Sequence, residues 1–146
     1  MCLAVYIASD HVLPTVAWDE ARPAFHVQEA EFYPHNPVLQ HVTKPLVYSA
    51  GTYNGCGCSF RFDEAYDDEG ECVPDDSPGQ LESRRGLADF LSAALQHQAT
   101  VEVFTCCSGV ESFPPKHHRR AKPMDFVLDR TLYRFGELIV VSERDT

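Results

Sequence analysis

Basic residues are scarce in this chain. It has 12 lysines and arginines against 22 aspartates and glutamates, which gives 146 residues a formal net charge of −10. Contacts with phosphate need clustered positive charge, so the composition argues against nucleic acid as a partner and against an anionic membrane surface. The same negative charge would suit a basic protein partner.

Long apolar runs are missing as well. No stretch reaches the roughly 20 residues that a membrane-spanning helix needs, and the N-terminus has neither the basic region nor the apolar segment of a signal peptide. We therefore expect a cytoplasmic location, where thiols are kept reduced. The six cysteines are then expected to bind metal or take part in catalysis rather than to form a disulfide framework.

Several motifs that would identify a chemistry are absent. The sequence contains no C-x-x-C redox pair, no repeated zinc-ribbon knuckle, no nucleophile elbow, no phosphate-binding loop and no dinucleotide fingerprint. The substrate class is therefore left open. The length and the 44% apolar content fit one ordinary domain with a sizeable core, so we expect a single domain over residues 1–146.

Short β-prone segments and one amphipathic helix predict an α+β fold. Between residues 81 and 98, apolar side chains recur at helical spacing and form one stripe: Leu87, Phe90, Leu91, Ala94 and Leu95. Strands are expected at 2–8, 24–29, 45–50, 56–62, 100–105, 126–135 and 137–143. The order predicts a mainly antiparallel sheet with one principal helix packed on one face.

The stretch before that helix is strongly acidic. Residues 63–80 hold eight aspartates and glutamates up to Asp76 and no lysine or arginine. We interpret 63–80 as a mobile, solvated loop, and we expect Cys72 within it to be exposed and dispensable.

The most distinctive stretch is Gly51–Phe60, which carries Cys56 and Cys58 among glycines. If residues 56–62 form a strand after the turn at Asn54, both thiols point to the same face, about 6–7 Å apart. Either burial or metal ligation is then expected to protect Cys56 and Cys58 from alkylation.

Two further strand-like segments carry cysteine at their ends. Cys2 begins the first segment, and Cys106 and Cys107 follow residues 100–105. If these segments are neighbours in one sheet, Cys2, Cys56, Cys58 and Cys106 converge on one site. Four thiolates suit tetrahedral zinc, so the preferred hypothesis is a small protein that binds a thiophilic metal through this cysteine cluster.

Two other functions remain open from the sequence. The protein could be a thiol-dependent enzyme that uses Cys2, Cys106 or Cys107 as its nucleophile. It could instead be a non-enzymatic acidic interaction or inhibitor protein, whose cysteines only pack and whose carboxylates steer a basic partner.

Overall fold

The computed structural model describes residues 2–32, 34–61, 64–66, 69, 72–74 and 77–144. Its elements, in chain order, are β1 (Leu3–Ser9), β2 (His26–Glu29), the 3₁₀-helix η1 (Pro37–Gln40), β3 (Leu46–Gly51), the 3₁₀-helix η2 (Cys58–Phe60), β4 (Glu64–Tyr66), β5 (Cys72–Pro74), α1 (Pro78–Ala94), β6 (Val101–Cys107), β7 (His117–Ala121), α2 (Asp125–Leu128) and β8 (Glu137–Val141).

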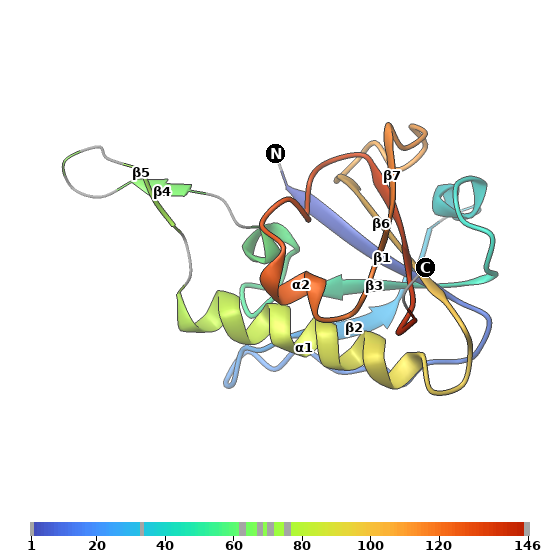
Figure 1. Cartoon of the computed structure of the whole chain (residues 1–146), viewed down its shortest axis with the longest axis horizontal. Coiled ribbons are helices and arrows are strands. Elements are labelled where there is room, and N and C mark those ends of the chain that lie inside the picture. Colours follow the sequence, from blue (N-terminus) through green and yellow to red (C-terminus); the bar gives the residue numbers. More distant parts are fainter. Residues whose placement is uncertain are drawn as a thin grey trace.

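Six strands form one sheet in the order β2-β3-β1-β6-β8-β7. Every neighbouring pair is antiparallel except β7 and β8, which run parallel. β1 lies in the centre, and its register places Leu3 opposite Cys107 and Val5 opposite Ala50. α1 runs along one face of the sheet and packs against α2 and η2 (Figure 1). The predicted α+β class, a mainly antiparallel sheet with one principal helix, is confirmed.

α1 begins earlier and ends earlier than the apolar stripe predicted. The side chain of Gln80 accepts the backbone N–H of Ser77 at 3.0 Å in a capping box, and Pro78 occupies the first turn. Both features favour a helix start at this point. The helix ends at Ala94, and a turn at residues 95 and 96 follows it. The predicted bounds of 81–98 were therefore displaced by a few residues at each end.

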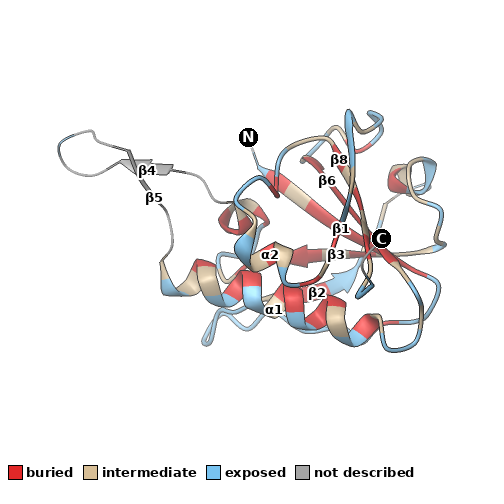
Figure 2. Ribbon diagram, viewed as in Figure 1, coloured by how far each residue is buried: buried red, intermediate tan, exposed pale blue. Residues whose placement is uncertain are grey.

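The sheet divides the apolar residues into two cores. The larger core lies between the sheet and α1 and contains Leu3, Val5, Leu87 and Leu91. A smaller cluster on the other face contains Tyr6, Val38, Phe104 and Cys106. Because side chains alternate along a strand, β1 and β6 each contribute to both cores. Figure 2 shows buried residues along the central strands and along the inner side of α1.

One prediction for the C-terminal third was wrong. Residues 126–135 do not form a strand, because α2 is followed by turns through Thr131. Tyr133 takes a positive φ of 65° there, and its hydroxyl donates to the carbonyl of Phe126 at 2.7 Å. The sheet's last edge comes instead from β7, the basic His117–Ala121 segment.

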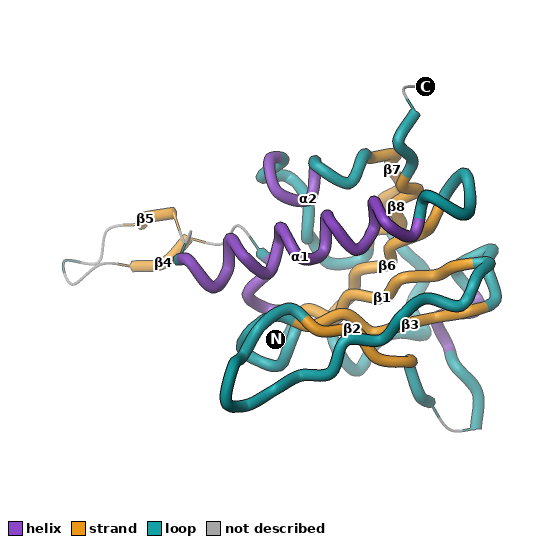
Figure 3. Tube along the Cα trace, turned by 90° about the horizontal axis from the view of Figure 1, so that it is seen from below, coloured by secondary structure: helices purple, strands orange, loops and turns teal. Residues whose placement is uncertain are grey.

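The acidic stretch predicted as a loop contains structure at its described positions. β4 and β5 form a separate two-stranded antiparallel sheet before the start of α1 (Figure 3). The remainder of that stretch lies outside the described residues, so its mobility stays a prediction, as does the single-domain organisation. In the part of the chain that the structure describes, no helix is both long and apolar enough to span a bilayer.

Candidate functional site

η2 lies beside the beginning of β1 (Figure 1). We call Cys2, which precedes β1, together with Cys56 and Cys58 the thiol site. After β3 the chain turns back, because the backbone N–H and the hydroxyl of Thr52 both donate to the carbonyl of Cys56, at 2.8 and 2.7 Å. Gly55 completes this turn with a φ of 87°, a value that favours glycine. This turn places the segment that carries Cys56 and Cys58 beside the start of the central strand β1.

A close approach at Gly57 sets the distance between η2 and β1. A Cβ atom at this position would overlap the backbone carbonyl oxygen of Leu3. Its φ of −87° is ordinary for any residue, so glycine is required here for space and not for conformation. The strand predicted over 56–62 is therefore wrong at its described positions: the chain crosses β1 as a 3₁₀ turn and does not join the sheet beside it.

Arg84 on α1 holds the other end of η2. This side chain is fully buried. Its Nε donates to the carbonyl of Phe60 at 2.8 Å, and its Nη2 donates to the carbonyl of Arg61 at 2.6 Å. Phe60 is also fully buried, and its ring stacks on Tyr133 with centroids 5.6 Å apart. The turn that carries the thiols is thus tied to both the helix and the core.

Three thiols meet at this place. Cys58 interacts with both Cys2 and Cys56: these interactions lower the pKa of Cys58 and raise the pKa of Cys2 and of Cys56. Cys58 is half-buried, and Cys2 and Cys56 are exposed. Cys58 is therefore the central sulfur of the group, and the site is open to solvent.

The surroundings of Cys58 favour its thiolate. Burial alone would raise the pKa of Cys58, but hydrogen bonds from the backbone of Leu3 and from the thiols of Cys2 and Cys56 lower the pKa below its ordinary value. The hydrogen bond with Cys58 raises the pKa of Cys2. Desolvation and the contact with Cys58 raise the pKa of Cys56. Within this group Cys58 is therefore the thiol that loses its proton most readily.

The structure does not bring the fourth expected cysteine to this group. Cys106 is 3% exposed and lies in the smaller core, on the face of the sheet opposite α1. Burial and the nearby carboxylate of Glu111 raise the pKa of Cys106 to about 12. Its neighbour Cys107 is half-buried, and its charge raises the pKa of Cys2, so Cys107 is the nearer of the two to the thiol site.

The expectation for thiol accessibility is corrected at Cys56, which is exposed and not buried. The side chain of Cys72 lies outside the described residues. The five cysteines with described side chains are all free. Among the residues that the structure describes, no three histidine, cysteine or carboxylate side chains are arranged so that they could hold a metal ion. Comparisons with protein-family models, curated proteins and solved structures find no match to this chain.

The lowered pKa of Cys58 predicts an order of reactivity. With iodoacetamide near neutral pH, we expect Cys58 to be alkylated before Cys2 and Cys56, because the thiolate is the nucleophile. As the pH falls, Cys2 and Cys56 should lose reactivity first, and Cys58 only at a lower pH. Peptide mass spectrometry after timed quenching measures this order. Loss of Cys58 reactivity at the same pH as Cys2 would contradict it.

Proposed function

We propose that the protein carries out thiol–disulfide exchange, with Cys58 as the attacking thiolate and Cys2 as the resolving thiol. The observation that carries the proposal is the interaction of Cys58 with Cys2 across the close approach of Gly57 to Leu3, with Cys56 as a second neighbouring thiol. Cys2 is the preferred partner because it lies on another segment, whereas Cys56 shares one tight turn with Cys58. The cytoplasm remains the proposed location.

The exchange balances with a disulfide as the oxidant. The Cys58 thiolate attacks one sulfur of the substrate disulfide, forms a mixed disulfide, and releases the other sulfur as a thiolate that takes up a proton. Cys2 then loses its proton and attacks the Cys58 sulfur, which forms the Cys2–Cys58 disulfide and releases the second substrate thiolate. Two protein thiols are oxidised and one substrate disulfide is reduced to two thiols.

Oxidised glutathione, a low-molecular-weight disulfide, is a suitable probe for the full chain. We expect a Cys2–Cys58 disulfide to form, which peptide mapping under non-reducing conditions identifies. In Cys2→Ser, a mixed disulfide should accumulate on Cys58, because the resolving thiol is gone. In Cys58→Ser, the fast reaction should disappear.

Cys107→Ser is the matched control, since this half-buried thiol lies near Cys2 without a hydrogen bond to Cys58. Its reaction with glutathione disulfide should stay within about twofold of the unmodified protein. If Cys58→Ser reacts as fast as the control, Cys58 is not the attacking group and the proposal fails.

A second candidate is the binding of a thiophilic metal such as zinc. The donors would be the sulfurs of Cys2, Cys56 and Cys58, whose chemistry suits such an ion, but these side chains would have to rearrange, because no three such groups among the described residues are placed to hold a metal. Elemental analysis of protein purified without a polyhistidine tag separates the two candidates. About one equivalent of zinc, lost in Cys58→Ser, would favour the metal. Metal-free protein that reacts with glutathione disulfide would favour exchange.

A further inference from the structure

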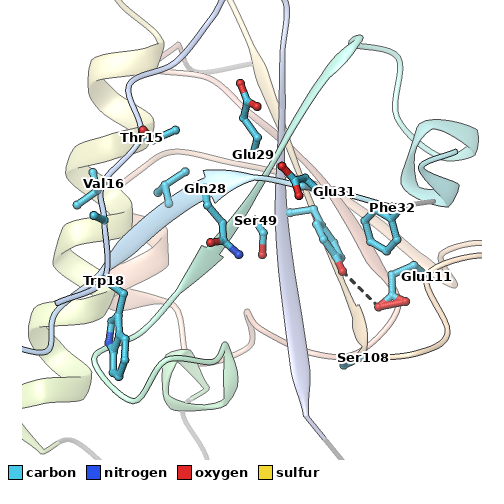
Figure 4. Close-up of a pocket in the computed structure, with 14 residues that line it drawn as sticks. Thr15, Val16, Trp18, Gln28, Glu29, Glu31, Phe32, Ser49, Ser108 and Glu111 are labelled. Carbon is cyan, nitrogen blue, oxygen red and sulfur yellow. Dashed lines mark hydrogen bonds between the residues drawn. The ribbon is translucent and has the colours of Figure 1, made fainter. Parts of the chain in front are cut away.

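A groove lies on the sheet face opposite α1, with a cavity volume of about 900 Å³. We call it the acidic groove. Its floor is formed by Gln28, Ser49 and Tyr6, which lie in one row across β2, β3 and β1 because the register pairs Ser49 with both other residues. Figure 4 shows Gln28 and Ser49 between Trp18 on one side and Glu111 on the other. The volume falls in the range of ligand pockets, about 300–1,000 Å³.

The outer wall comes from the chain segment before β2. Val16 and Val27 exchange backbone hydrogen bonds of 2.9 and 3.0 Å, so this segment lies along the outer edge of β2. Trp18 follows on the same segment. Its indole N–H donates to the carbonyl of Tyr53 at 3.3 Å, and 43% of the residue remains exposed. The wall therefore presents a positioned aromatic side chain to the groove.

Negative charge is distributed along the groove without a compensating cation. Glu29, Glu31 and Glu111 line it, and its lining within the described part of the chain includes no lysine, arginine or histidine. Glu111 is held by two contacts: the Gly109 backbone N–H donates to both carboxylate oxygens, and the Tyr6 hydroxyl donates to Oε1 at 3.2 Å. Glu29 and Glu31 are exposed.

Aromatic rings lie beside these carboxylates. The rings of Tyr6 and Phe32 pack with centroids 5.9 Å apart, and both line the groove together with Trp18. Aromatic faces bind ammonium and guanidinium groups and the alkyl stems that carry them. Carboxylates and aromatic rings around a floor of hydrogen-bonding side chains are therefore complementary to a chain with cationic side groups.

We propose that the acidic groove binds a lysine- or arginine-bearing peptide segment of a partner protein. The carboxylates of Glu29 and Glu31 pair with its cationic heads, the rings of Trp18 and Phe32 cover the alkyl stems, and Gln28 and Ser49 are placed to bond the peptide backbone. The groove is open and about three strands wide, which suits an extended segment better than a compact small molecule. A second copy of this acidic chain is a poor occupant, because its net charge is −10.

Trp18 makes the test direct, because it is the one tryptophan of the chain. The probe is a capped peptide of alternating lysine and alanine, titrated into the full chain at about 0.15 M salt with tryptophan emission as the signal. We expect a saturable change in emission with the lysine peptide and none with a glutamate–alanine peptide of equal length. The double variant Glu29→Gln with Glu31→Gln should weaken binding about tenfold.

The matched control removes two exposed carboxylates from α1, on the other side of the sheet: Glu82→Gln with Asp89→Asn. It changes the net charge equally and should keep the affinity within about twofold. Equal weakening in both double variants would mean that binding follows net charge alone. The acidic groove would then not be the binding site. Spermidine that binds as tightly as the peptide would overturn the peptide as occupant. An unchanged Trp18 emission at saturating peptide would overturn the site itself.

Discussion

Replacing Arg84 by alanine is expected to lower the free energy of unfolding by about 4 kcal/mol, the largest effect of any single change considered for this chain. The substitution removes a fully buried side chain and leaves a cavity. It also leaves the carbonyls of Phe60 and Arg61 without the charged donor that they face now. A buried carbonyl that loses its partner costs about 1–3 kcal/mol on its own.

Chemical denaturation followed by circular dichroism measures this loss. Arg85→Ala is the matched control, because Arg85 is adjacent and exposed, and its change should stay within about 0.5 kcal/mol. The Arg84 variant should also form less Cys2–Cys58 disulfide, since η2 is no longer tied to α1. Equal stability of the two variants would mean that Arg84 does not hold the turn in place.

Gly57→Ala is expected to cost about 3 kcal/mol and to separate the thiols of Cys58 and Cys2. The added Cβ would overlap the carbonyl oxygen of Leu3, which is backbone in the central strand and has no freedom to rotate away. Overpacking against a rigid partner costs about 1–3 kcal/mol, and here η2 must lift from β1 to relieve it. The hydrogen bond from Leu3 to Cys58 is then lost, so the pKa of Cys58 should return toward its ordinary value.

The control for this prediction is Gly109→Ala. Gly109 has a positive φ of 99° but open space around its Cβ position, so alanine there brings backbone strain of about 1 kcal/mol and no clash. Alkylation of Cys58 near neutral pH should slow markedly in Gly57→Ala and stay unchanged in Gly109→Ala. A Gly57 variant with full stability and fast Cys58 alkylation would contradict the close approach as the feature that builds the site.

The local pattern of apolar residues was sufficient to predict most strands of the sheet and the principal helix. The apolar segments at 2–8, 45–50 and 100–105 correspond to β1, β3 and β6, and the stripe through Leu87 and Leu91 corresponds to the buried face of α1. Burial repeats every second residue in a strand and every three to four residues in a helix. The spacing of apolar residues in the sequence has the same periodicity, so it predicts these elements.

Tertiary contacts determined the secondary structure of the segments where the sequence pattern and the structure differ. Residues 126–135 are apolar and aromatic enough for a strand, yet the turns around Asp129 and Thr131 interrupt them. His117–Ala121 is too basic to predict as a strand, and it pairs at the sheet's edge, where Arg119 meets the buried carboxylate of Glu137 at 2.9 Å. An edge strand can expose its polar side chains, so its sequence carries little of the periodic signal.

Some features of the thiol site also followed from the sequence, and others only from the tertiary structure. The sequence by itself determined that Cys2, Cys56 and Cys58 belong to segments able to meet, and that only one of Cys106 and Cys107 can face a given side of the sheet. Only the tertiary structure decided that Cys106 faces the smaller core, that Cys58 is the central sulfur, and that a 3₁₀ turn carries it. Those outcomes depend on the register of β1 with β6, on the space left by Gly57 and on the bonds from Arg84. These contacts join residues far apart in the chain, so no local pattern specifies them.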